Sequence, residues 1–337
     1  MRKSVAFIFR MLLLFALLGA MAVAYQWWQY GHAPLVGAGS KAAFEVRRGE
    51  GGRPLAATLQ KAGIPVQGWE LALAWRARGD SDRIKAGRYE LEGPVTLQGL
   101  LDQLITGQAA KERMVVLIEG WTFRQVREAL AKAPELVNTT ADLSDAQIMQ
   151  KLDATEAHPE GMFAPDTYAY VLGSPDIDLL SRAYRLQQQR LAAAWQNRAD
   201  GLKLESEREL LILASIIEKE SARDEERPMI SSVFHNRLRL GMMLQSDPTT
   251  IYGIGEAFDG NLRRNHLRAD TPYNTYFRSG LTPTPISMPG QGSLEAAAHP
   301  APSKALYFVS RGDGTSEFSK DLNSHNKAVS RYQRKLQ

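Results

Sequence analysis

An uncharged apolar run near the N-terminus most constrains the fold of this chain. It reads MLLLFALLGAMAVAYQWW, from Met11 to Trp28, and contains no Asp, Glu, Lys or Arg. Counted back through residues 5–9, with the Arg10 side chain snorkelling toward water, it offers about 20 apolar positions, enough for one membrane crossing as a helix. Positive charges precede the run, at Arg2, Lys3 and Arg10. They predict a cytoplasmic N-terminus, with residues 29–337 on the other side of the membrane.

The residues that close the run agree with this interpretation. Trp27, Trp28 and Tyr30 carry the amphipathic rings that gather at a membrane–water interface. A cleaved signal peptide is the alternative, because Ala22-Val23-Ala24 resembles an A-x-A cleavage site. The length of the run and its aromatic end favour an uncleaved single-pass anchor over residues 1–28. Both interpretations predict that the rest of the chain is exported.

Length and composition bound what the exported part can be. With 337 residues, one large domain and a smaller module are expected. The net charge of +4 comes from scattered Lys and Arg without a basic stripe, so nucleic acid is not an expected partner. The chain has no cysteine, which excludes disulfides and Cys-ligated zinc. Its six histidines show no metal-binding spacing, so we expect neither a metal site nor a cofactor.

The pattern of the chain predicts an α+β fold in two parts after the anchor. Residues 29–43 are small and polar and read as a linker. Residues 44–110 predict a small α+β module. It has strands at FEVRR and AGRYEL, helices near residues 54–61 and 66–77, and a last helix ending at Gly107. This order is LysM-like. Residues 111–337 form the larger domain.

The larger domain is expected to begin with a strand at RMVVLIEG and a helix over residues 122–132. Thr122 and Gln125 fit a capping box at the start of that helix. Further helices are predicted over residues 177–199, 206–221 and 228–240, the last opened by Pro228 and stopped by Gly241. Residues 241–290 are rich in Gly, Pro, Asn and Tyr and read as long loops, which often carry function. A short helix at SLEAAAH and a hairpin turning at residues 312–314 complete the domain.

One predicted helix ends in two glutamates, in the stretch LLILASIIEKES. On a helical wheel, Leu210, Leu213, Ile216 and Ile217 form one apolar stripe, and Glu220 lies within about 20° of its centre. Glu218 and Lys219 are turned away from that stripe by more than about 100°. Glu220 is therefore predicted to point inward. Burial would raise its pKa toward the range that a general acid needs.

Two structural roles remain open for Glu220 at this point. It could form a buried ion pair with an arginine such as Arg237, or the helix could end before it. The two glutamates cannot act together as a glycosidase pair, because residues i and i+2 of a helix do not face each other. We therefore expect at most one acid, Glu220, and expect Glu218 to orient a neighbour.

Six stretches of the chain resemble the YceG-like family in order and spacing. The resemblance covers nearly the whole chain and is strongest from Glu160 to Pro300. The stretches are EGMFAPDTY, ASIIEKES, SVFHNRLRLGMMLQSDPTTIYG, TPYNTY, GLTPTPISMPG and SLEAAAHP. The family's catalytic glutamate is the second of the E-K-E motif, which corresponds to Glu220. This agrees with the wheel, which points to the same residue independently.

The resemblance implies an inner-membrane enzyme with its catalytic domain in the periplasm. It implies a lytic transglycosylase that cuts the β-1,4 bond between N-acetylmuramic acid and N-acetylglucosamine in peptidoglycan glycan strands. The cut is non-hydrolytic and leaves 1,6-anhydromuramoyl ends. Release of nascent strands is implied as well, so peptidoglycan synthases are expected partners. A single acid suits this reaction, because the C6 hydroxyl of the sugar replaces an activated water.

Other polar residues of the long loops are candidates for substrate contact. Long loops carry function more often than chance, although turn formation is the alternative at Asp247-Pro248 and around Asn274. Asp247 and Asp166 are conceivable partners of Glu220, and Asp166 is expected rather to brace its own loop. The predicted substrate-binding residues are Gln245, Asn274, Tyr252, Tyr276 and Asn236. Two other functions remain open, namely a muramidase that hydrolyses the same bond and a membrane-anchored scaffold without activity that binds the wall.

Overall fold

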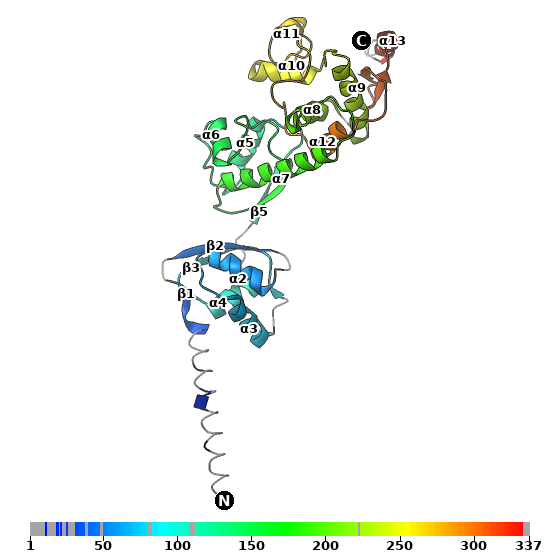
Figure 1. The fold of residues 1–337 in the computed structure, drawn as a ribbon. Coiled ribbons are helices and arrows are strands. Elements are labelled where there is room, and N and C mark those ends of the chain that lie inside the picture. The colour runs from blue at the N-terminus through cyan, green and yellow to red at the C-terminus, as the bar shows by residue number, and fades with distance from the viewer. Residues whose placement is uncertain are drawn as a thin grey trace, which may run out of the picture. The chain divides into compact units, whose positions relative to one another are not determined.

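A computed structural model describes residues 31–332 except 38–39, 48–49, 80–82, 108–111 and 222, together with residues 11, 18, 19, 21 and 25. The chain divides into two compact units, Met1–Glu112 and Arg113–Gln337. Each is mixed helix and sheet, so the predicted α+β class is confirmed (Figure 1). Most of the predicted anchor lies outside the described residues. Within the part of the chain that is described, no helix has the length and apolar character needed to cross a membrane.

In its described residues after the predicted anchor, the first unit packs three helices, named below, with two small sheets. In one sheet β2 and β3 run antiparallel, and Phe44 stacks on Tyr89 across the pair with 5.6 Å between ring centroids. Alternate residues of β2 are buried, as a strand with one face on a core requires. The elements are β1 (Pro34–Val36), β2 (Lys41–Val46), α2 (Gly52–Lys61), α3 (Gly68–Arg78), β3 (Gly87–Glu92), β4 (Val95–Thr96) and α4 (Leu97–Thr106).

The linker predicted over residues 29–43 is shorter than expected. Residues 34–36 form β1, which pairs with β4, and residues 41–43 already belong to β2. The small side chains at the start of β2 hid this strand, because Lys41, Ala42 and Ala43 have low strand propensity. Pairing with β3 outweighs that local preference.

The second unit is built around one buried helix, α8. Every residue from Leu210 to Ile217 is buried, because α7, α9, α10 and α12 all contact α8 (Figure 1). The elements before α8 are β5 (Glu112–Leu117), α5 (Phe123–Lys132), α6 (Asp145–Lys151), β6 (Asp166–Val171) and α7 (Asp176–Gln196). Those from α8 onward are α8 (Glu207–Glu220), α9 (Arg227–Arg239), α10 (Asp247–Ile254), α11 (Arg264–Arg268), α12 (Gln291–Ala298), β7 (Tyr307–Ser310), β8 (Ser316–Ser319) and α13 (Leu322–Tyr332). Short 3-10 turns, η2 (Asp224–Glu226) and η3 (Gly255–Ala257), precede α9 and follow α10.

Local signals at several helix ends are confirmed. Thr122 and Gln125 form the predicted capping box of α5, and Pro228 lies in the first turn of α9. Gly241 follows α9 with a φ of 68°, in the left-handed region where glycine carries no Cβ penalty. Such ends are predictable because each depends on only a few adjacent residues.

The long loop expected over residues 241–290 was only partly correct, because it contains α10 and α11. Asp247-Pro248, which read as a turn, starts α10 with the proline in its first turn. The same residue pair suits both structures, since proline has the φ of a helix N-terminus as well as that of a turn. α10 brings its first residues to the end of α8.

Candidate active site

Three segments meet at the C-terminal end of α8. The first is the end of α8 itself, where Glu220 is the last helical residue. The second is the turn over residues 241–246, which joins α9 to α10. The third is the segment over residues 271–276, which is hydrogen-bonded to that turn. The meeting of these segments surrounds one carboxyl group with polar residues that are distant in the sequence.

Glu220 is half-buried and has one close hydrogen-bond partner. The Ser246 hydroxyl donates to Glu220 Oε1 at 2.6 Å. Ser246 is itself buried, and its backbone N–H donates to Thr275 Oγ1 at 3.0 Å. The inward direction predicted for Glu220 agrees with this placement. The interaction occupies one oxygen of the carboxyl and leaves Oε2 as the position for a transferable proton.

The surroundings of Glu220 hold its carboxyl near the midpoint of titration at neutral pH. Burial raises the pKa of Glu220 to about 7, from an ordinary 4.5. The hydrogen bond from Ser246 lowers this pKa, the negative charge of Asp247 raises it, and the positive charge of Arg237 lowers it. A carboxyl with such a pKa can both donate and accept a proton at neutral pH.

Arg237 shapes the turn that carries Ser246. Its Nη1 donates to the carbonyl oxygens of Met243 and Leu244 at 3.1 and 2.8 Å and to Gln245 Oε1 at 3.2 Å. Its Nε donates to the Leu306 carbonyl at 2.7 Å. Among the described residues it forms no ion pair with Glu220, so the buried pair left open by the sequence is not what the structure contains. The guanidinium acts on Glu220 by its charge and by holding the turn.

Two predicted substrate-binding residues are near Glu220. Gln245 is exposed beside Ser246 and has a φ of 52°, a left-handed conformation that is strained for a residue other than glycine. The Tyr276 hydroxyl donates to Asp247 Oδ1 at 2.6 Å, and the negative charge of Glu220 is among the causes that raise the pKa of Tyr276. The polar residues that lie beside Glu220 are therefore Gln245, Asp247 and Tyr276.

Asn274, a third predicted substrate-binding residue, is buried and hydrogen-bonded within the protein. Its side chain is 0% exposed, and its Nδ2 donates to the carbonyl oxygens of residues 266, 267 and 269. Its Oδ1 accepts from Thr250 Oγ1 and from the Tyr276 backbone N–H. Both ends of the amide are occupied within the protein, so Asn274 joins α10 to α11 and to the residue that follows it.

Asn236 and Tyr252 are also directed elsewhere. The Asn236 amide donates to the carbonyl oxygens of Ser303 and Ala305, which fastens α9 to the segment before β7. The Tyr252 hydroxyl donates to Glu160 Oε2 at 3.0 Å, at the far end of α10 from Asp247. The sequence could not separate these residues from Gln245 and Tyr276, because all of them are polar and lie in the same region of the chain.

The first glutamate of the E-K-E motif, Glu218, has a structural role. Its side chain is 6% exposed and pairs with Arg227 at 3.2 Å. Its Oε2 accepts the backbone N–H of Gly290 at 2.9 Å. Glu218 thus orients its neighbours, as expected. The helical wheel predicted that Glu218 points away from the apolar stripe. Its side chain is nevertheless buried, because other helices pack around α8.

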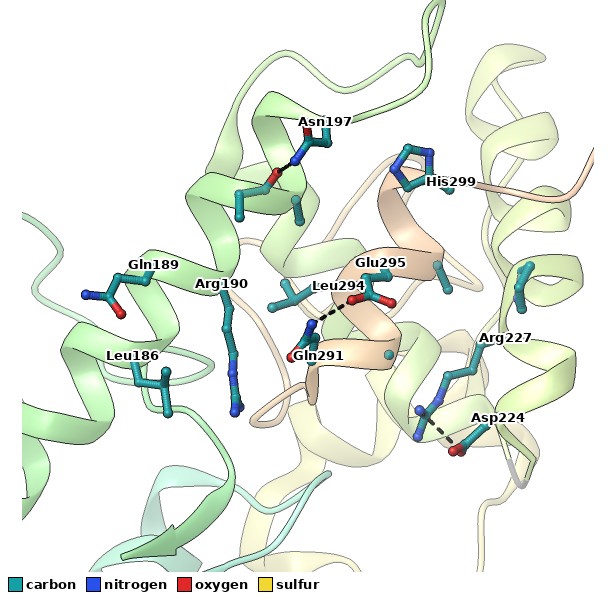
Figure 2. Close-up of a pocket in the computed structure, with 15 residues that line it drawn as sticks. Leu186, Gln189, Arg190, Asn197, Asp224, Arg227, Gln291, Leu294, Glu295 and His299 are labelled. Atoms are coloured by element: carbon teal, nitrogen blue, oxygen red, sulfur yellow. Dashed lines mark hydrogen bonds and ion pairs between the residues drawn. The ribbon is translucent and has the colours of Figure 1, made fainter. Parts of the chain in front are cut away.

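A cavity of about 960 Å³ lies on the Arg227 side, between α7, the start of α9 and α12 (Figure 2). Figure 2 shows Arg227 paired with Asp224, and Gln291 hydrogen-bonded to Glu295, on its walls. Glu220 does not line this cavity. The carboxyl with the raised pKa, Glu220, therefore lies outside this cavity.

Glu160 is another buried carboxyl, and the sequence did not single it out as a site residue. It is 4% exposed, and burial raises its pKa to about 7. Its position in EGMFAPDTY, a segment dense in aromatic residues, is the signal that could have indicated burial. Asp166, in the same stretch, accepts from the Thr167 N–H and from Arg190, each at 2.8 Å. It braces its loop, as predicted.

In the described part of the chain, no group of three or more histidine, aspartate or glutamate side chains could hold a metal ion. The end of α8 offers the carboxyl of Glu220, hydrogen-bonded to Ser246. A protonatable carboxyl with one fixed oxygen is suited to proton transfer to and from a bound group.

Comparison with known proteins shows what this chain is similar to. The profile of the YceG-like family matches residues 44–331. An endolytic murein transglycosylase of Bacillus subtilis is 33% identical over an alignment of 266 positions, and the match covers 74% of this chain and 73% of the relative. An endolytic murein transglycosylase of Streptococcus pneumoniae is 26% identical over an alignment of 320 positions, and the match covers 85% of this chain and 57% of that longer relative.

A solved structure shares the fold. The crystal structure of a yceG-like protein from Listeria monocytogenes aligns with a TM-score of 0.52 at 28% sequence identity. The alignment covers 85% of this chain and 98% of that protein.

Proposed function

Because this chain belongs to the YceG-like family, we propose that it is an endolytic peptidoglycan lytic transglycosylase, a lyase with Glu220 as its catalytic acid. The substrate is the glycan strand, cut at the β-1,4 bond between N-acetylmuramic acid and N-acetylglucosamine. The names of the relatives support the reaction. The observation that carries the assignment of the residue is the half-buried carboxyl of Glu220, with a pKa raised to about 7 and one oxygen fixed by Ser246.

In the first step Glu220 is protonated and acts as a general acid. Its proton passes to the glycosidic oxygen while the bond between C1 of muramic acid and that oxygen breaks. The bonding electrons leave with the oxygen, which becomes the hydroxyl of the departing sugar. Positive charge develops on the muramic ring, and the Glu220 carboxylate formed in the same step is the nearest compensating charge.

In the second step the C6 hydroxyl of the same muramic residue attacks C1. The Glu220 carboxylate takes the hydroxyl proton, the 1,6-anhydro ring closes, and the acid regains its starting form. An intramolecular nucleophile needs no carboxylate to activate water, because its effective concentration is already high. One titrating group with a pKa near 7 suits both transfers.

Mass spectrometry of the products tests this function. The full-length protein is incubated with peptidoglycan, and the new ends are identified. We expect 1,6-anhydromuramoyl ends from the wild type and no new ends from E220Q, which keeps the size of the side chain and the bond from Ser246. E205Q is the matched control, because Glu205 is exposed and precedes α8 at the end opposite Glu220. Turnover by E220Q would overturn the assignment.

A muramidase is the second candidate, and Asp247 is the observation that favours it. Asp247 lies close enough to raise the pKa of Glu220 and could activate a water molecule. Its Oδ1 is already bonded to Tyr276, which makes the lyase the better-supported reaction. Ordinary reducing ends in place of anhydro ends would establish the muramidase. If the protein is a scaffold without activity, it produces neither kind of end. Its E220Q variant should then bind the wall as well as the wild type does.

The setting of the enzyme is part of the same proposal. Residues 1–28 anchor the chain in the inner membrane with the N-terminus cytoplasmic, and the catalytic unit is periplasmic. The first unit is a LysM-like module, and peptidoglycan synthases are partners in strand release. The uncharged run between residues 11 and 28 supports the anchor. Protease added to spheroplasts tests the topology. Degradation of the large unit is expected, and its protection would contradict the proposal.

A further inference from the structure

Glu160 links two parts of the catalytic unit that are far apart in the sequence. Its Oε1 accepts the backbone N–H of Phe123, the first residue of α5, at 3.0 Å. Its Oε2 accepts the Tyr252 hydroxyl, from α10, at 3.0 Å. A buried carboxylate that accepts two hydrogen bonds fixes its donors more strongly than a neutral group would. Glu160 therefore ties α10 to the N-terminus of α5.

α10 is the helix that carries the partners of Glu220. Ser246 directly precedes it and Asp247 is its first residue, whereas Tyr252 lies about 7.5 Å further along the helix axis. Thr249 holds the first end, because its Oγ1 donates to the Ser246 carbonyl at 2.7 Å. Tyr252 holds the other end through Glu160 and packs edge-on against Tyr273, with 4.9 Å between ring centroids. The two ends together set where Ser246 and Asp247 lie.

The ionisation of Glu160 depends on groups from every element packed around it. Burial is the largest cause that raises its pKa, and the negative charge of Asp145 on α6 raises it further. The bonds from Tyr252 and from the backbone N–H groups of residues 123 and 161 lower it. A cavity of about 170 Å³ beside Glu160 is also lined by His158, Glu156, Glu207 and Arg208.

That cavity gives Glu160 a path for proton exchange. Its volume is sufficient for water. Gln188 also lines it, and the buried Nε2 of Gln188 has no hydrogen-bond partner among the described residues. A donor of this kind in a polar cavity favours bound water. Glu160 is thus buried from bulk solvent and still able to gain or lose a proton.

We propose that Glu160 is a positioning residue for the reaction at Glu220, whose ionised carboxylate holds α10 through Tyr252 so that Ser246 and Asp247 face the acid. This inference rests on the proposed function. A proton on Glu160 occupies one of its acceptor sites and weakens the hold on Tyr252 or Phe123. α10 then loosens at its far end, and the bond from Ser246 to Glu220 loses its alignment.

The proposal predicts a bell-shaped dependence of kcat on pH. The alkaline side falls because Glu220 loses its proton. The acid side falls because Glu160 gains one, and each pH unit below its pKa lowers the ionised fraction about tenfold. The pKa of each group lies at about 7, so the maximum is narrow and near neutral pH.

Two variants test the acid side. In E160Q the amide oxygen can accept from Phe123 and the amide nitrogen can donate to the Tyr252 oxygen, so the link survives without a titrating group. We expect its kcat to lose the acid-side decline and to keep the alkaline one. In Y252F the link is broken at every pH. We expect kcat to fall roughly tenfold at pH 7 with KM changed by less than about twofold, and the acid-side decline to disappear.

E205Q, at an exposed glutamate that precedes α8 at the end opposite Glu220, is the matched control and should keep the complete wild-type profile. The melting temperature of each variant shows whether it is folded as stably as the wild type. An acid-side decline retained by both E160Q and Y252F overturns the inference, as does a lowered melting temperature with an unchanged pH profile. Failure of the proposed function is a separate result, because it appears as turnover by E220Q.

Discussion

Glu218 and Glu220 lie two residues apart at the end of α8 and have separate partners. Glu218 is paired with Arg227 and bonded to the Gly290 backbone, whereas Glu220 receives the Ser246 hydroxyl. One carboxyl is therefore built into the packing of α8 and the other is kept available for proton transfer. This division gives the two positions opposite mutational behaviour.

Glutamine at each position should separate stability from activity. E218Q leaves Arg227 without its most buried counter-charge and should lower the free energy of unfolding by on the order of 3 kcal/mol. E220Q should leave stability unchanged or higher and lower turnover roughly 10²–10⁴-fold. Urea denaturation and product formation per folded molecule measure the two effects. Loss of turnover in folded E218Q would contradict the assignment of Glu218 to packing and of Glu220 to proton transfer.

The bond from Ser246 predicts a shift of the pH profile toward alkali when it is removed. This bond stabilises the ionised form of Glu220 and lowers its pKa. In S246A the pKa should rise above 7, by about one unit, so the alkaline decline of kcat moves to higher pH. S231A is the matched control, because Ser231 is a buried serine whose hydroxyl has no hydrogen-bond partner among the described residues. An unmoved alkaline decline in S246A would show that Ser246 does not act on the acid.

The charge of Asp247 predicts a shift of opposite sign. Asp247 raises the pKa of Glu220, and D247N removes the charge while keeping an oxygen for the Tyr276 hydroxyl. The alkaline decline of kcat should therefore move to lower pH. In the double variant S246A/D247N, the pH of the alkaline decline should lie between the values for the two single variants. Shifts of the same sign in both single variants would mean that the electrostatic explanation is wrong.

The two raised carboxyl pKa values predict how stability depends on pH. Glu160 and Glu220 each have a pKa of about 7 in the folded chain, against an ordinary 4.5. The folded state therefore binds more protons than the unfolded state between these values. Their contribution is fully present below about pH 4.5 and is lost as pH rises through 7, by about 3 kcal/mol for each group.

Unfolding by urea at pH 5 and pH 8 measures this loss. The difference between the two pH values should be smaller in the double variant E160Q/E220Q than in the wild type, since other titrating groups are common to both proteins. Equal differences would refute the raised pKa values.

Two glycines with similar backbones predict different responses to alanine. Gly161 has a φ of 79°, and a Cβ there would lie 2.6 Å from Pro285 Cβ. Gly173 has a φ of 82°, and nothing lies within 4 Å of the position that an alanine methyl group would occupy there. G173A should lose about 1–2 kcal/mol from backbone strain alone. G161A should lose at least about 1–3 kcal/mol more from the clash with Pro285. Equal melting temperatures would contradict this packing.

Local sequence signals predicted the helices well and the contacts between segments poorly. The extents of α7, α8 and α9 follow from apolar periodicity and from end signals such as Pro228 and Gly241, which depend on neighbouring residues. The inward direction of Glu220 follows from the same periodicity. The bond from Ser246 to Glu220 spans 26 residues, and no local pattern indicates it.

The polar residues of the 241–290 region show a second limit. Asn274 and Tyr276 are two residues apart, yet one is fully buried and the other borders Glu220. A buried amide can satisfy the backbone groups of a turn as well as bind a ligand, and the residue type is the same in both roles. α10 escaped prediction for a related reason, since Asp247-Pro248 suits a turn and a helix start equally.

The enclosure of α8 by four other helices has a consequence for how the molecule opens. Amide hydrogens in the middle of a helix so enclosed exchange with solvent only when the whole unit unfolds, whereas surface helices exchange through local fluctuations. We therefore expect α8 to be the slowest-exchanging element of the unit, with Glu220, the proposed proton donor, at its end. Adaptation to different wall architectures would then come from the segments laid over that end, with the acid itself remaining in place.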